Sequence, residues 1–142
     1  HPPRRAALPK PLGAVGVQLG TRFLVAKECG VHQNYKNKVL KANDIATMST
    51  GKRLGHPVRS IKNPYTKEYF KLEYSNISDE ELEAYGRGAL YRAAVEGDEK
   101  TGCFLAGQIA GMVNKEQTAK EIIEEIFTQA EDVLKGATKW VK

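Results

Sequence analysis

Residue types that often reveal a function are scarce in this sequence. There are only two cysteines, Cys29 and Cys103, and they form no CxxC pair. The three histidines, His1, His32 and His56, show no metal-ligand spacing. These shortages exclude a disulfide scaffold and predict no metal site. They favour reduced thiols in a cytoplasmic protein.

Long hydrophobic runs are also absent. No apolar stretch approaches the roughly 18 residues of a membrane span, so no membrane partner is expected. The basic start, HPPRRAALPKP, has no apolar centre and is not a secretory signal. A chain of 142 residues is one domain or a piece of a larger one. A complete eight-stranded α/β barrel needs about 250 residues, so that fold cannot fit here whole.

Charge is distributed unevenly along the chain. Residues 1–62 carry 12 Lys and Arg against 2 Asp and Glu, whereas residues 63–142 carry 10 against 15. A basic first half suits anionic partners such as phosphates or an acidic protein, although a solvated surface explains it equally well.

The first 11 residues hold four prolines and three basic residues, and we expect a disordered or loosely attached leader there. Residues 12–19, LGAVGVQL, predict a buried strand. The Gly20-Thr21 turn then leads into a helix over residues 22–28. A single buried strand needs partners for its backbone groups, which points to missing upstream sequence or to another chain.

The rest of the chain is predicted to be mainly helical. We expect helices over 34–43 with Asn34 as N-cap, over 65–74, and from Ser78 to about residue 95. Residues 44–62 predict loops or short strands. The last helix is expected to follow a capping box of Asn114 and Gln117 and to end at Gly136. Its apolar face comprises Ala119, Ile122, Ile123, Ile126, Phe127, Ala130, Val133 and Leu134.

The motif GAVGVQLGTRF, residues 13–23, carries the best functional signal. A strand that ends in Gly-Thr before a helix exposes backbone N–H groups, and Gly20 lets an anion approach them closely. The Thr21 hydroxyl can donate a further hydrogen bond, and Arg22 and Lys27 raise the local potential. The competing interpretation is a packed strand end, in which Gly20 serves tight helix–sheet contact.

GAVGVQLGTRFLVAKE resembles the last barrel strand and following turn of flavin-dependent trans-2-enoyl-acyl-carrier-protein reductases. It is also similar to their relatives, the nitronate monooxygenases. The resemblance continues through VHQNYKNKVLKAND, LGHPVRSIKNPYT, GALYRAAVEGD and CFLAGQIAGMVNKEQTAKEII, and it spans about residues 12–142. It implies an α/β fold class: the C-terminal segment of a TIM-type (β/α)8 barrel, with the last β-α unit and a helical C-terminal region, and not a complete barrel.

The resemblance also implies a flavin site. FMN would be the cofactor, with Gly20 and Thr21 at its phosphate, Gln18 on the strand close to the flavin, and Gly107 and Gln108 on a loop beside the isoalloxazine ring. NAD(P)H would supply a hydride, and an enoyl thioester on acyl carrier protein would receive it. Homo-oligomers are expected.

The sequence also departs from the family pattern. The family's catalytic histidine lies in an upstream Gly-Gly-His motif that this sequence lacks, so no catalytic residue is assigned here, and the chain alone is expected to be inactive. The other phosphate-binding glycine loop is missing too. HPPRRAALPKP does not match the family and is interpreted as foreign to it.

Other candidates are weaker. His32 and His56 fit structural or surface roles, and Arg53, Arg59 and Lys62 form a basic stretch that suits NADPH phosphates or an acidic carrier protein. The alternatives to an enoyl reductase are a nitronate monooxygenase, an inactive helical binding module, and a nucleic-acid-binding protein. The aromatic cluster around residues 65–74 has acidic neighbours, which argues against nucleic acid.

Overall fold

The computed structural model describes residues 16–137. Residues 16–19 form no strand there, so the strand predicted over residues 12–19 is wrong in its described half, and its first half lies outside the described residues, like the leader 1–11. Among the described residues, no neighbouring strand pairs with this segment. A strand without a partner cannot satisfy its backbone groups.

Two short helices follow that segment. Helix α2 spans Thr21–Leu24 and is much shorter than the helix predicted over residues 22–28. It stops because Lys27 N donates to Gln117 O at 2.9 Å, which fixes the chain in an extended bridge. Helix α3 spans Gln33–Leu40, and its N-cap is His32 rather than Asn34. Nδ1 of His32 accepts the backbone N–H of Asn34 at 3.1 Å, because that ring sits at the first free amides of the helix.

A hairpin occupies the region predicted as loops or short strands. Strands β1, Thr47–Thr50, and β2, Val58–Ile61, pair antiparallel with Thr47 opposite Ile61. Residues 104–106 add a third extended segment beside β2: Ile61 N donates to Phe104 O and Ala106 N donates to Arg59 O. The hairpin therefore ties the middle of the chain to the segment that precedes Gly107.

Helix α4 packs beside the hairpin, and two more helices follow it in the chain. Helix α4 spans Pro64–Glu73, α5 spans Asp79–Gly86 and α6 spans Ala89–Ala94. The capping box of Ser78 and Glu81 is confirmed. The single helix predicted to residue 95 is two helices instead, because Gly88 adopts φ 73° and turns the chain between them.

The described part of the chain ends with a 3-10 turn and a helix of 19 residues. The turn η1 spans Gln108–Met112, and α7 spans Ala119–Ala137. Its capping box is Thr118 with Glu121, not Asn114 with Gln117: Glu121 N donates to Thr118 Oγ1 at 3.2 Å, and Thr118 N donates to the Glu121 carboxylate at 2.7 Å. Gly136 lies inside α7 instead of ending it.

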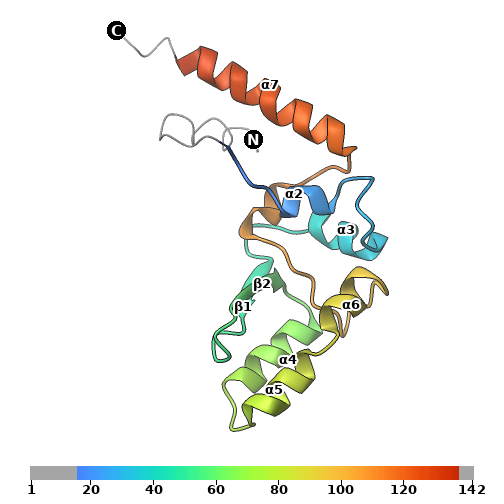
Figure 1. The fold of residues 1–142 in the computed structure, drawn as a ribbon, viewed down its shortest axis with the longest axis vertical. Helices are drawn as coiled ribbons and strands as arrows, with labels where there is room; N and C mark the ends of the chain where they lie inside the picture. The colour runs from blue at the N-terminus through green and yellow to red at the C-terminus, as the bar shows by residue number, and fades with distance from the viewer. Residues whose placement is uncertain (1–15, 138–142) are drawn as a thin grey trace.

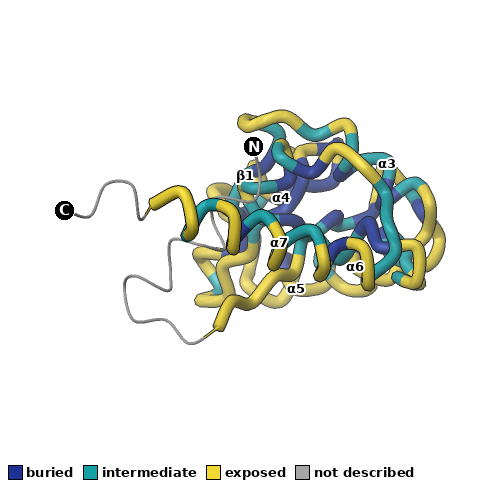
Figure 2. Tube along the Cα trace, turned by 90° about the horizontal axis from the view of Figure 1, so that it is seen from above, coloured by how far each residue is buried: buried dark blue, intermediate teal, exposed yellow. Residues whose placement is uncertain are grey.

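Two buried clusters hold the elements together, and α7 extends beyond them (Figure 1). The larger joins the end of α2, α3, β2, α6 and η1, with Val25, Tyr35, Val39, Ile61, Ala93, Phe104, Ala106, Ala110 and Val113. The smaller joins α4, α5 and α6 through Tyr65, Tyr69, Leu82 and Ala89. Figure 2 shows the buried trace concentrated in the body and mostly intermediate or exposed residues along α7.

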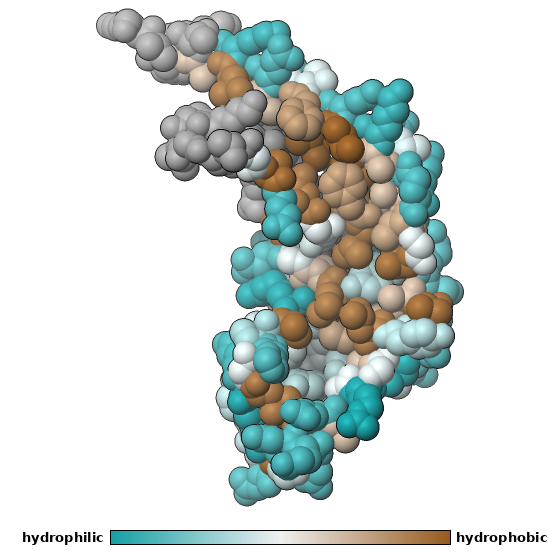
Figure 3. Space-filling view, in the orientation of Figure 1, coloured by the Kyte–Doolittle hydropathy of each residue, from teal (hydrophilic) through white to brown (hydrophobic). Residues whose placement is uncertain are grey.

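The apolar face of α7 is only partly covered. Ile122 and Ala130 are buried, whereas Ile123 is 46% exposed and Phe127 is 61% exposed. Figure 3 shows hydrophobic side chains gathering over α7 and the adjoining part of the body. No helix in the described residues is long and apolar enough to cross a bilayer.

Candidate functional site

The Gly20-Thr21 turn lies at the surface, where residues 16–19 meet α2. Gly20 has φ −98°, which any residue can adopt. A methyl group placed on it would meet no heavy atom of the described chain within 4 Å. Within residues 16–137, therefore, neither backbone strain nor tight packing requires glycine at this position. What the glycine leaves is open space beside the first amides of a helical turn.

A second segment, 86 residues further along the chain, meets this turn. The backbone N–H of Gly107 donates to Oγ1 of Thr21 at 2.9 Å. The hydroxyl of Thr21 thus accepts one hydrogen bond and keeps its proton free to donate another. The structure brings together two of the segments that the sequence resemblance assigned to one flavin site.

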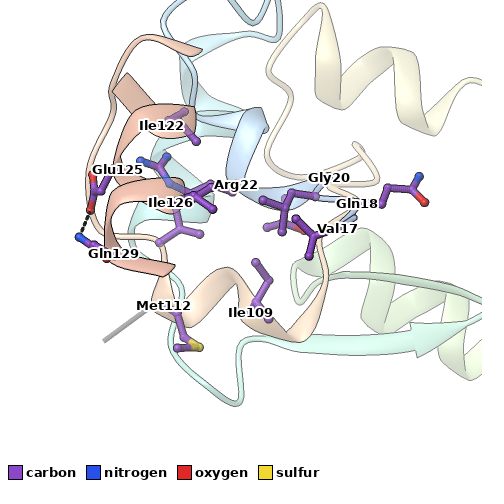
Figure 4. A pocket seen from close by; sticks show the side chains of 13 residues that line it. Val17, Gln18, Gly20, Arg22, Ile109, Met112, Ile122, Glu125, Ile126 and Gln129 are labelled. Atoms are coloured by element: carbon purple, nitrogen blue, oxygen red, sulfur yellow. Dashed lines mark hydrogen bonds between the residues drawn. The ribbon is translucent and has the colours of Figure 1, made fainter. Parts of the chain in front are cut away.

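A cavity of about 320 Å³ opens beside the turn, between residues 17–22, η1 and α7 (Figure 4). Gln18, Gly20 and Thr21 line it, whereas Gly107 and Gln108 do not. In Figure 4 the Gln18 side chain points away from α7. Gln108 is exposed at the start of η1. The five predicted residues thus lie on two neighbouring surfaces joined by the Thr21–Gly107 hydrogen bond.

Sequence reasoning missed the other wall of this cavity. It is formed by Ile109, Met112 and Val113 near η1 and by Ile122, Glu125, Ile126 and Gln129 of α7. The spacing of the α7 residues places them on one helix face, which was the available signal. Most of this wall is apolar, so it suits an apolar group better than a phosphate.

The basic side chain beside the turn contacts the loop before α7. Arg22 donates to Lys115 O at 3.3 Å and to the side-chain oxygen of Gln117. Burial lowers the pKa of Arg22, and the nearby Glu125 carboxylate opposes that shift. These contacts show that Arg22 fixes the loop that leads into α7.

The loop before α7 is also held by side chains of α3. Lys36 is buried and donates to Ala26 O at 2.7 Å and to the carboxylate of Glu116 at 3.2 Å. The side chains of Gln33 and Lys36 both hydrogen-bond Glu116 and lower the pKa of its carboxyl. Together with the bonds of Arg22, these contacts fix the loop of residues 115–117, which leads into α7, relative to α2 and α3.

The basic stretch of Arg53, Arg59 and Lys62 has structural partners. Arg53 binds Asp79 at 2.8 Å and also donates to the backbone oxygens of residues 75 and 77. Arg59 donates to Thr47 Oγ1, and Lys62 donates to a carbonyl before β1. These bonds stabilise the hairpin and its link to α5. No group of three potential metal ligands is found within residues 16–137.

The chain is similar in sequence to nitronate monooxygenases. A sequence profile of the nitronate monooxygenase family matches residues 5–129. A probable nitronate monooxygenase of Staphylococcus saprophyticus is 30% identical over 87% of this chain and 34% of its own length. A probable nitronate monooxygenase of Bacillus subtilis is 27% identical over 81% of this chain and 33% of its own length.

The fold has a close structural match. The structure of FabK from Thermotoga maritima superimposes with a TM-score of 0.92 at 36% identity, over 98% of this chain and 44% of that one. This likeness confirms the expected fold class, a portion of a TIM-type barrel and not a complete one. The chain spans about a third of the length of the curated relatives it matches. On these findings the chain belongs to the nitronate monooxygenase family of flavin-dependent oxidoreductases and corresponds to a C-terminal portion of that superfamily.

Proposed function

We propose that this chain forms one side of the flavin site in an FMN-dependent enoyl-acyl-carrier-protein reductase. Gly20 and Thr21 would hold the phosphate of FMN, Gln18 would lie near the flavin, and Gly107 with Gln108 would lie beside its ring. The hydrogen bond from Gly107 N to Thr21 Oγ1 carries this proposal, because it joins the two segments across 86 residues.

The residues present fit a phosphate. Among the first amides of α2, that of Phe23 already donates to Gly20 O at 2.9 Å. The N–H groups of Thr21 and Arg22 would therefore be the ones available to an anion. The Thr21 proton is free to donate, and the open side of Gly20 admits a ligand atom close to the backbone. These neutral donors would orient the phosphate, since Arg22 is engaged with the loop before α7.

The chemistry divides between cofactor and protein. When bound, FMN would supply hydride transfer between NAD(P)H and the enoyl double bond. This chain would bind and orient the cofactor, but the two histidines within residues 16–137 would offer no proton-transfer group: His32 caps α3, and His56 is exposed at the hairpin turn. The substrate would be an enoyl thioester on acyl carrier protein, in a cytoplasmic homo-oligomer.

A flavin measurement tests the cofactor assignment. The intact protein that carries this segment should bind FMN stoichiometrically, seen as the visible absorbance of bound flavin, whereas this chain alone should bind none or traces. Stoichiometric FMN on this chain alone would contradict the idea that the site needs further residues. No FMN on the intact protein would contradict the function itself.

Nitronate monooxygenase is the second candidate, and the family profile and the names of the curated relatives favour it. The 36% identity and TM-score of 0.92 with FabK are the reasons for placing the reductase first. Two assays on the intact protein separate them: NADPH oxidation that depends on a crotonyl thioester, and oxygen uptake that depends on a nitronate. Oxygen uptake alone would reject the reductase.

A further inference from the structure

The loop that precedes Gly107 has one backbone oxygen whose partner comes from a distant helix. Residues 104–106 lie along β2, with bonds from Ile61 N to Phe104 O at 2.8 Å and from Ala106 N to Arg59 O at 3.1 Å. Leu105 sits between these bonds, opposite Ser60. In an antiparallel pair such a residue directs its own N–H and C=O away from the neighbouring strand. The Leu105 carbonyl must therefore find a partner on the other side.

Tyr35 of α3 provides that partner. Its hydroxyl donates to Leu105 O at 2.7 Å, and its side chain is only 2% exposed. The Tyr35 ring also meets Phe104 edge to face, with centroids 5.0 Å apart. Burial raises the pKa of Tyr35 far above its ordinary value, so the phenol stays protonated and remains a donor.

The same short segment ends at the candidate site. Two residues after Leu105, Gly107 N donates to Thr21 Oγ1 at 2.9 Å. The segment is thus fixed on one edge by β2, on the other by Tyr35, and at its end by Thr21. Its backbone position decides whether the Thr21 hydroxyl keeps this acceptor role, which leaves its proton available to donate.

We infer that Tyr35 is a positioning residue for flavin binding, acting through the Leu105 carbonyl on Gly107 and Thr21. This inference rests on the proposed function for the identity of the ligand. Tyr35 touches none of the residues assigned to the flavin in any hydrogen bond of the described chain. Its role is to donate a hydrogen bond to the Leu105 carbonyl, which faces away from β2.

The test removes the hydroxyl group of Tyr35. Tyr35→Phe in the intact protein should raise the dissociation constant for FMN about three- to tenfold, the usual worth of one hydrogen bond. It should also speed amide hydrogen exchange at Gly107, a measurement that needs no flavin. The matched control is Tyr65→Phe, the same change at a tyrosine buried in the other cluster, which should alter neither quantity.

The outcomes distinguish failure of the proposed function from failure of the positioning role of Tyr35. If the unmodified protein binds no FMN, the proposed function fails, while exchange at Gly107 still tests the positioning. If Tyr35→Phe lowers the melting temperature but leaves FMN affinity and Gly107 exchange as in the unmodified protein, Tyr35 is merely structural and the inference is overturned. Equal effects from both variants would overturn it as well.

Discussion

Replacing Gly20 with alanine separates binding from stability at this site. The backbone there has φ −98° and ψ −67°, a conformation open to alanine, and the added methyl group would meet no described heavy atom within 4 Å. Alanine should therefore leave the free energy of unfolding unchanged or raise it by about 0.4–1 kcal/mol, because it reduces the freedom of the unfolded chain.

Flavin binding should respond in the opposite direction. If the phosphate of FMN occupies the open space beside Gly20, the new methyl group would crowd it. Crowding of this kind costs about 1–3 kcal/mol. That is a rise in the dissociation constant for FMN of roughly 5- to 150-fold. The assays are a flavin titration of the intact protein and thermal denaturation without flavin.

Gly102 offers the matched control. A methyl group there would lie 2.5 Å from Asp98 O and 2.8 Å from the Cα of Ala93. Gly102→Ala should therefore lower the melting temperature while the folded protein keeps its FMN affinity. If Gly20→Ala destabilises the protein, or leaves FMN affinity untouched, then Gly20 is not at the phosphate and the assignment is refuted.

Three further predictions address the site and its support. Thr21→Val should weaken FMN binding about tenfold while Thr21→Ser retains it, since only the hydroxyl links Gly107 to the ligand; equal binding by both variants would remove Thr21 from the site. Ile122→Ala should lower the free energy of unfolding in urea by about 2–5 kcal/mol, because that residue is only 1% exposed. Phe127→Ala, at 61% exposure, should lower it far less. A larger loss at Phe127 would mean that α7 packs through a different face. Hydrogen bonds from Gln33 and Lys36 lower the pKa of Glu116, so their stabilising effect is present above its ordinary pKa of 4.5 and is lost as the pH falls through the lower folded value. Thermal denaturation across that range should show Glu116→Gln flattening the acid-side decline, and an unchanged decline would argue that this carboxylate has no such role.

The sequence by itself determined the local features whose cause is local. The capping box of Ser78 and Glu81 and the amphipathic face of α7 follow from side chains within a few residues of each other. Order and type of several linked motifs likewise determined the family resemblance and the α/β barrel fragment. The break between α5 and α6 at Gly88 was harder to predict, because the sequence does not show whether a glycine in a helical pattern adopts a positive φ.

Only the tertiary structure decided what depends on distant contacts. Residues 16–19 look like a buried strand but form none in the described chain, since a strand exists only when a neighbour pairs with it. Arg22 was expected only to raise the local potential of the turn, but its side chain binds the loop before α7, 93 residues away. The bond between Thr21 and Gly107, and the support that Tyr35 gives it, join segments 86 and 70 residues apart. Such contacts depend on how the hairpin and α3 pack, and the spacing of residues along the chain does not specify that packing.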